Sequence, residues 1–246
     1  MKIYLAGEGY KPFLSDEFYD FYRLASFTYI QKDKVEITAI PKFKDFILDS
    51  GIFTYLNGKD PTKVDWDEYL HRYAAFVREN QIKNYVELDI DKAIGLAAVE
   101  KLRSRLNKMV GWDCIPVWHF GRGYDKWLEV CKDYSYVCFG AFLTDGLDKN
   151  KYPYITQFLN DAKKNNCKVH GLGFTVFDWL KKLPFYSVDS SSWTAGNRYG
   201  HACAFRRDRV LNVGKPIGHK VADHRKLASH NFYEWIKFSQ YTENTL

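Results

Sequence analysis

The chain lacks any hydrophobic run long enough to cross a membrane. No apolar segment reaches the ~18 residues of a membrane span, and Met1-Lys2 leads directly into a strand-like segment instead of a signal peptide. Cysteines are also few: there are five, they are scattered, and no two form a CxxC pair. We therefore expect a cytoplasmic protein with reduced thiols and no membrane partner.

Internal repeats, low-complexity tracts and linkers are absent from the 246 residues, which predicts a single domain over residues 1–246. The hydrophobic content of 46% and the charged content of 27% are those of an ordinary globular protein. The length is typical of one (β/α)8 barrel. The net charge of +6 is compatible with a polyanionic partner but does not require one.

Strand-like and helix-like segments alternate along the chain. The predicted strands are Lys2–Gly7, Phe46–Gly51, Tyr85–Asp91, Cys114–Gly121, Tyr136–Phe142, Lys168–Phe174 and Tyr186–Ser191. The predicted helices are Asp65–Asn80, Asp91–Met109, Tyr124–Asp133, Tyr152–Asn166, Val176–Leu183 and Phe232–Tyr241. This order predicts an α/β fold with a parallel sheet, a single TIM-like (β/α)8 barrel. Arg209–Val213 is the candidate eighth strand; the alternative is a barrel that is irregular or incomplete at its last unit.

Two of the predicted strands stop at an aspartate that is followed by small residues. One contains Asp49, in the sequence LDSG, and the other contains Asp189, in the sequence VDSSSW. Parallel α/β enzymes place catalytic acids at the carboxyl ends of their strands. Two such strands in one barrel predict a two-carboxylate active site.

The other strand ends supply further polar groups and glycines. The third strand delivers the acids of VELDID, the fourth delivers His119, and the sixth delivers the sequence HGLG. Glycines in the fifth and sixth strands allow a flat ligand to approach the backbone closely. Together with nearby aromatic residues, this collection suits a planar heterocycle with acids at its edges.

These motifs carry a family resemblance. The sequence LDSGIF at 48–53 resembles the Asp-Ser-Gly-Gly-Phe motif of tRNA-guanine transglycosylases, and HGLG at 170–173 resembles their Gly-Gly-Leu-Ala turn. Asp189 falls where that family has its nucleophile, and LDID at 88–91 falls where it has a base-recognising acid. The similarity is closer to small phage-encoded DNA 7-deazaguanine transglycosylase-like proteins, and it covers residues 2–200.

The resemblance implies exchange of guanine for a 7-deazaguanine-type base in a nucleic acid. Asp189 would attack C1′ and form a covalent intermediate, and Asp49 would act as general acid and base. Asp89 or Asp91 would accept hydrogen bonds from the purine, with Asp91 favoured as a helix N-cap. Phe53 would stack on the ring, and the 171–173 turn would offer backbone groups. The implied substrate-binding residues are Ser50, Gly51, Phe53, Asp89, His119, Gly171, Leu172, Gly173 and Ser190.

The chain also departs from the family pattern. Ile52 replaces the second glycine of the first motif, and Thr54 replaces the glutamine that follows it. The zinc site of the tRNA enzymes is missing, because only Cys203 lies in that region, so neither a metal nor another cofactor is expected. The chain is shorter than the tRNA-modifying members, which favours DNA over tRNA as the partner. A phage origin would place the protein in the host cytoplasm.

The C-terminal segment 198–246 is basic. Eight lysines and arginines lie between Arg198 and Lys226, against two acids. One interpretation is a solvated, irregular last unit. The other is a phosphate-contacting surface beside the mouth of the active site. The residues assigned to nucleic-acid binding in the second interpretation are Arg198, Arg206, Arg207 and Lys220.

Other hypotheses remain open at this point. A metal-dependent barrel hydrolase would use His119, His170, Asp89 and Asp189 as ligands, although the first strand lacks the expected His-x-His. A catalytically silent nucleic-acid-binding barrel is a third hypothesis. Asp49 is also compatible with a helix N-cap or a turn, and Asp189 with a polar turn. The two histidines are compatible with core positions or with positions that support the catalytic groups. The sequence does not indicate an oligomeric state.

Overall fold

The structure is a computed structural model that describes residues 1–8, 19–56, 60–140, 149–214, 218 and 220–246. Within these ranges, the side chains of Phe53, Lys149, Asn197 and Arg198 lie outside the description. All five cysteines are described, and all are free and buried.

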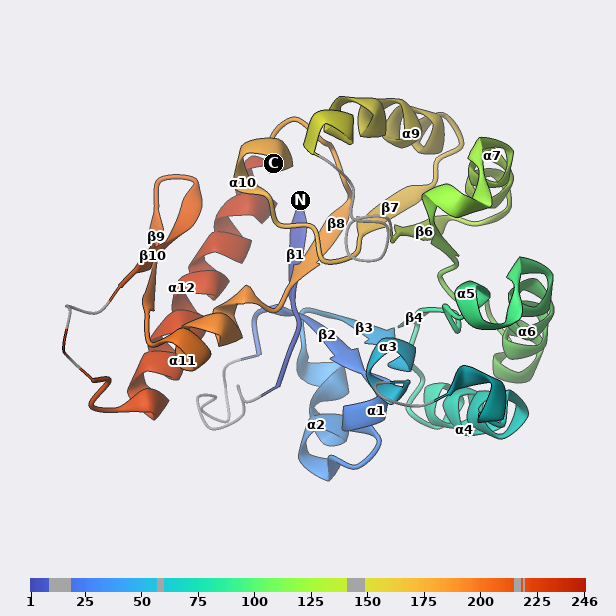
Figure 1. Cartoon of the computed structure of the whole chain (residues 1–246), viewed down its shortest axis with the longest axis horizontal. Helices are drawn as coiled ribbons and strands as arrows, with labels where there is room; N and C mark the ends of the chain where they lie inside the picture. Colours follow the sequence, from blue (N-terminus) through green and yellow to red (C-terminus); the bar gives the residue numbers. More distant parts are fainter. Residues whose placement is uncertain (9–18, 57–59, 141–148, 215–217, 219) are drawn as a thin grey trace.

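Eight parallel strands form one curled sheet with helices around its outside (Figure 1). The strands are β1 Lys2–Leu5, β2 Tyr22–Ser26, β3 Asp45–Asp49, β4 Asn84–Tyr85, β5 Val117–Trp118, β6 Tyr136–Phe139, β7 Lys168–Gly171 and β8 Ser187–Ser190. Their order is β4-β3-β2-β1-β8-β7-β6-β5. This is consistent with a TIM-like barrel, but no regular ladder of the described strands closes the curl. The edge strands meet only at a parallel bridge between Val86 and Ile115.

The predicted eighth strand was wrong. Arg209–Val213 forms β10, which pairs antiparallel with β9, Ala202–Arg206, in a separate hairpin. The two strands are joined by a tight turn with Arg207 at φ 58°, and so short a connection permits only antiparallel pairing. The strand missing from the prediction is β2, between β1 and β3. Its second residue is Arg23, a charged side chain that breaks the apolar pattern of a buried strand.

The predicted helices are present, Tyr124–Asp133 with its predicted boundaries and the others with changed ones. The helices of the described chain are α1 Phe27–Ile30, α2 Lys34–Ala39, α3 Ile52–Tyr55, α4 Trp66–Glu79, α5 Asp91–Ile94, α6 Leu96–Val110, α7 Tyr124–Asp133, α9 Tyr152–Lys164, α10 Phe177–Leu180, α11 Ala195–Tyr199 and α12 His224–Thr245. The predicted helix over residues 91–109 is split at Gly95, whose φ of 83° is incompatible with a continuous helix. Helix α12 begins eight residues earlier than predicted, at an N-cap formed by Asp223.

The sheet has a hydrophobic core on each of its two faces. Alternate strand residues point to opposite faces, so Tyr4 of β1 packs inside the curl while Ile3 and Leu5 pack under the outer helices. The buried residues inside the curl are Tyr4, Ala6, Tyr22, Leu24, Ile47, Val86, Ile115, Val117 and Cys138. The curl is therefore filled with side chains, and a ligand can reach it only at its ends.

Helix α12 joins the two ends of the chain. Ser239 Oγ donates to the carbonyl oxygen of Ile3 at 2.9 Å. The terminal amine of Met1 donates to the carbonyl oxygen of Thr242 at 2.9 Å. The end of α12 thus lies at the amino end of β1. No helix of the described chain is long and apolar enough to span a membrane.

A buried ion pair attaches α2 to the sheet, and we expect it to matter for stability. Arg23 Nε donates to Glu36 Oε1 at 2.7 Å, and both side chains are almost fully buried. Glu36→Gln should lower the free energy of unfolding by about 3 kcal/mol, because it removes the buried counter-charge of Arg23 and leaves only the exposed Glu8, 3.4 Å away. Urea unfolding measures this. Glu79→Gln, at an exposed position of α4, is the control; equal losses in both variants would contradict the prediction.

Candidate active site

Three carboxylates meet at the carboxyl ends of the strands. Asp49 is the last residue of β3, Asp189 lies in β8, and Asp89 follows β4. The charges of Asp189 and Asp89 both act on Asp49, which shows that the three groups share one region. The sheet thus brings together the two acids of the predicted site with the acid predicted to bind the base.

Asp49 is held by a backbone N–H instead of a cation. Its Oδ2 accepts a hydrogen bond from Gly51 N at 2.8 Å. Burial raises the pKa of Asp49 to about 6, and the charges of Asp189 and Asp89 add to this increase against the opposing effect of the Gly51 bond. Asp49 therefore changes between acid and base close to neutral pH. An ordinary aspartate in a turn also makes the hydrogen bond that Asp49 makes to Gly51 N. Such an aspartate does not have a raised pKa, whereas Asp49 does.

The backbone around Asp49 requires glycine at position 51. Gly51 has φ of 75°, and an added Cβ would lie 2.4 Å from Thr28 Oγ1. Ile52, which replaces the family's second glycine, is buried in the core. Ser50 is also buried, and its carbonyl oxygen accepts from Tyr69 OH at 2.6 Å. Phe53 lies in α3, but its predicted stacking falls outside the described side chains.

Asp189 is oriented by two donors. Its Oδ1 accepts from Gly173 N at 2.7 Å and lies 3.2 Å from Nε2 of the fully buried His170. His170 Nδ1 lies 2.7 Å from Ser187 Oγ, which in turn lies 2.6 Å from Tyr136 OH. A neutral His170 that donates from Nε2 accepts the Ser187 proton at Nδ1, so the whole chain of hydrogen bonds is satisfied. His170 therefore positions Asp189, which is one of the roles that the sequence left open for this histidine.

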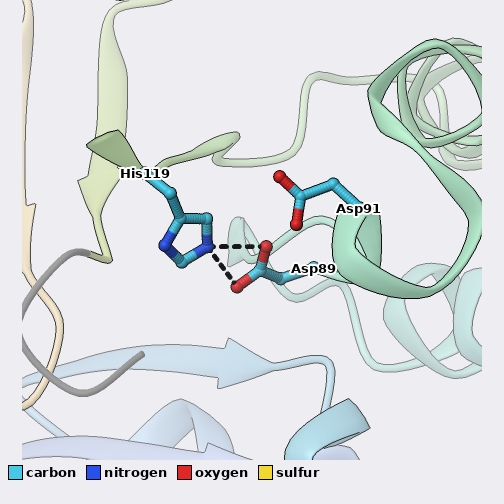
Figure 2. Close-up of side chains that lie close together, drawn as sticks. All are labelled: Asp89, Asp91 and His119. Carbon is cyan, nitrogen blue, oxygen red and sulfur yellow. Dashed lines mark hydrogen bonds and ion pairs between the residues drawn. The ribbon is translucent and has the colours of Figure 1, made fainter. Parts of the chain in front are cut away.

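His119 holds Asp89 in the same way. Figure 2 shows the ring of His119 facing the carboxylate of Asp89, with Nε2 2.8 Å from each oxygen. Burial by itself lowers the pKa of His119, but the hydrogen bond and charge of Asp89 outweigh it and raise the pKa above its usual value. Gly140, directly after β6, is one of the glycines predicted to admit a flat ligand. A Cβ at this position would lie 2.5 Å from His119 Cε1. The flat group that uses this space is the His119 ring.

Arg122 neutralises the acids that follow β4. Its Nη1 donates to Glu87 at 2.9 Å, its Nε to Asp91 at 2.8 Å, and its Nη2 to Asp89 at 3.2 Å. Its side chain is only 3% exposed. The sequence analysis missed this residue; the signal was the three acids of VELDID, which require a cation when they are buried together. Asp91 begins α5 and binds Arg122, so its predicted role as N-cap was wrong.

The 171–173 turn does not present its N–H groups to a base. Leu172 N donates to the carbonyl oxygen of Phe139 at 3.1 Å, and Gly173 N donates to Asp189. The side chain of Leu172 packs on the core inside the curl. Gly171 is close-packed, since a Cβ there would lie 3.2 Å from Phe174 and Phe185. The backbone donors expected for the base are therefore used by the protein itself.

Ser190 is held beside Asp189 by two neighbours. Its Oγ accepts from Thr175 Oγ1 at 3.1 Å and from Ser192 N at 3.2 Å, and the residue is buried. These contacts are structural. They leave Ser190 adjacent to the candidate nucleophile without placing its hydroxyl in open solvent.

Two of the basic residues predicted at the mouth of the site lie at the other end of the sheet. Arg206 and Arg207 are exposed at the tip of the β9–β10 hairpin, which points to the same side as the chain ends in Figure 1. The neighbouring Asp208 pairs with Lys181, which precedes β8, and Phe205 contacts Tyr241 near the end of α12. The hairpin tip is thus near the amino ends of the strands. Lys220 is exposed before α12, and the Arg198 side chain lies outside the description.

One group in the described chain has the geometry of a metal site. Ligand atoms of Asp89, Asp91 and His119 lie within 4.8 Å of one another (Figure 2). Neither His170 nor Asp189, the other two ligands of the hydrolase hypothesis, belongs to this group. Arg122 binds both aspartates, so its guanidinium would compete with a cation for the same oxygens.

No protein-family model and no curated protein matches the chain.

The raised pKa of Asp49 predicts a pH-dependent effect on stability. Because the pKa is about 6 in the fold and 3.8 ordinarily, ionising Asp49 destabilises the fold as the pH rises through this range. Asp49→Asn, which keeps an acceptor for Gly51, should raise the melting temperature relative to wild type at about pH 8 but not at about pH 4. Asp133→Asn, at an exposed position, is the control. An equal shift at both pH values would show that the Asp49 pKa is ordinary.

Proposed function

We propose that this protein is a guanine transglycosylase on a TIM-like (β/α)8 barrel, which exchanges guanine in DNA for a 7-deazaguanine-type base. The observation that carries the proposal is the pair of acids with different surroundings at one end of the sheet. Asp49 has a pKa of about 6, suited to proton transfer, and Asp189 is oriented by His170 and Gly173. Two carboxylates with divided roles are the machinery of glycosyl transfer with retention.

In the first half-reaction, Asp189 attacks C1′ of the target nucleotide as the bond from C1′ to guanine N9 breaks. The Oδ1 atom is held by His170 and Gly173, so we assign the attack to Oδ2. Protonated Asp49 gives its proton to the leaving guanine, and the electron pair of the broken bond stays on the base. The product is a glycosyl ester of Asp189 and a neutral free guanine.

In the second half-reaction, the incoming base replaces guanine in the same place. Ionised Asp49 removes the proton from N9 of the 7-deazaguanine as N9 attacks C1′, and Asp189 leaves as a carboxylate. Asp49 is then protonated again and ready for the next turnover. A group that alternates between acid and base works best when its pKa is close to the working pH, which is the property that burial confers on Asp49.

Asp89 is the group we assign to the amide and amino edge of the base. Its side chain is 24% exposed, and a carboxylate has about four acceptor positions. His119 and Arg122 fix its orientation and leave acceptor capacity for a ligand. Since the donors of the 171–173 turn are already used, the carbonyl groups of this turn are the backbone atoms left for the base.

A metal-dependent hydrolase is the second candidate, favoured by the grouping of Asp89, Asp91 and His119. The position of Arg122 argues against it. A guanidinium already satisfies the carboxylates that a cation would need, and displacing it from Asp89 and Asp91 would leave the buried Arg122 with Glu87 alone of its three carboxylate partners.

Variants of the two acids should separate their roles. Asp189→Asn should abolish any covalent complex with DNA, because the nucleophile is lost. Asp49→Asn should slow guanine exchange about 100-fold or more, because the acid and base is lost while the nucleophile remains. Denaturing gels with labelled DNA detect the covalent complex, and release of radioactive guanine measures exchange. Full exchange by Asp189→Asn would refute the assignment.

In the wild type, formation of the complex should slow as the pH rises through about 6, since Asp49 must be protonated.

Chelation distinguishes the two candidate functions. Guanine exchange should be unchanged after dialysis against EDTA, and mass spectrometry of the purified protein should find no stoichiometric divalent metal. Asp91→Asn serves as the matched variant, because it removes one of the three grouped ligands but none of the groups assigned to exchange. A metal that is bound by the wild type and lost in Asp91→Asn would favour the hydrolase.

A further inference from the structure

A pocket lies close to Asp189 in the chain, outside the group of carboxylates. It has a volume of about 310 Å³ and is formed by the end of β7, α10, α11, the β9–β10 hairpin and α12. Two of its lining residues, Thr175 and Ser192, are those that hydrogen-bond Ser190, the neighbour of Asp189. The pocket therefore lies one residue along β8 from the proposed nucleophile, on the outer face of the strand to which the Ser190 side chain points.

Two buried nitrogen atoms in the wall of this pocket lack hydrogen-bond partners. They are Nε2 of His201 and Nε1 of Trp235. Trp235 is only 3% exposed. The thiol of Cys203 lies close to the Trp235 indole, but a thiol is a weak acceptor. Buried polar groups are normally paired, so two such atoms in one pocket indicate a ligand that supplies acceptors. Asn212, in the same wall, adds an amide with both kinds of group.

The pocket also offers flat aromatic surfaces. Tyr199 lines its rim, is 72% exposed, and lies parallel to the His201 ring within 3° at a centroid distance of 6.2 Å. Phe177 and Trp235 form another aromatic pair in the wall, 6.2 Å apart. An exposed tyrosine at the rim of a pocket is the usual platform on which proteins stack an unpaired base.

We propose that this pocket binds the base of the nucleotide next to the one being exchanged. A nucleobase combines the features that the pocket requires: two flat faces, and carbonyl or ring-nitrogen acceptors at its edge for Trp235 and His201. The position next to Asp189 places such a base one step along the strand from the target. This inference rests on the proposed function, because it takes a nucleic acid as the substrate. It predicts that the protein engages a strand whose neighbouring base is unstacked.

The test measures binding of a fluorescein-labelled single-stranded oligodeoxynucleotide with one guanine, by fluorescence anisotropy. Tyr199→Ala should weaken binding about tenfold, the size expected for the loss of one stacked base. Trp235→Phe, which removes the indole N–H donor together with part of the ring system, should weaken it several-fold. Tyr154→Ala is the control, since Tyr154 is 67% exposed on α9, away from the pocket, and should leave binding unchanged.

A second measurement identifies the base. Two oligodeoxynucleotides are compared, one with an abasic site immediately 5′ of the guanine and one with it immediately 3′. One of the two should bind the wild type less tightly than the intact strand does. With that oligonucleotide, Tyr199→Ala should cause no further loss of affinity. Equal binding of wild type and Tyr199→Ala to the intact strand, or an undiminished effect with both abasic strands, would overturn the proposal. So would a wild type that binds no oligonucleotide.

The outcomes for the two proposals are distinct. If the wild type exchanges guanine but its DNA binding does not depend on Tyr199, the base-binding role of the pocket is contradicted and the transglycosylase proposal stands. If DNA binding depends on Tyr199 but the wild type exchanges no guanine, the pocket proposal stands and the proposed function is contradicted.

Discussion

The parallel pairing of the eight strands is the constraint on which the rest of the molecule depends. It brings all the carboxyl ends of the strands to one side, so Asp49 and Asp189, 140 residues apart in the chain, act on each other electrostatically. The same pairing gathers buried negative charge, which is unfavourable without compensation. Much of the remaining architecture around the site supplies that compensation.

The compensation differs from one carboxylate to the next, and this difference is the basis of the proposed chemistry. Asp89 has a histidine and an arginine, and Asp189 has a histidine and a backbone N–H. Asp49 has a backbone N–H and two neighbouring carboxylates, so it is the acid whose pKa rises to about 6. Three similar side chains thus have three environments, set by whichever groups the adjoining strands and loops deliver.

Much of the fold can be predicted from the chain alone. The alternation of apolar strands with amphipathic helices indicates a parallel sheet, and seven of its eight strands overlap predicted segments. Strand β2 was missed because Arg23 interrupts its apolar run, and the compensating Glu36 lies on a helix where no local pattern reveals the pairing. Arg209–Val213 has the composition of a strand, but composition does not specify a partner, and the tight turn before it imposes an antiparallel one.

At the site, the sequence identified residues and the tertiary structure decided their tasks. Asp49, Asp89 and Asp189 stand out because a carboxylate at the end of an apolar strand is a local pattern. What pairs with each of them is not local: Arg122 follows a different strand from the acids that it neutralises. The arginines at 206 and 207 were expected at the mouth of the site from their charge, yet the hairpin carries them to the opposite end. Charge is a property of the chain, whereas the side of the sheet on which it is exposed is decided only when the hairpin packs against α12.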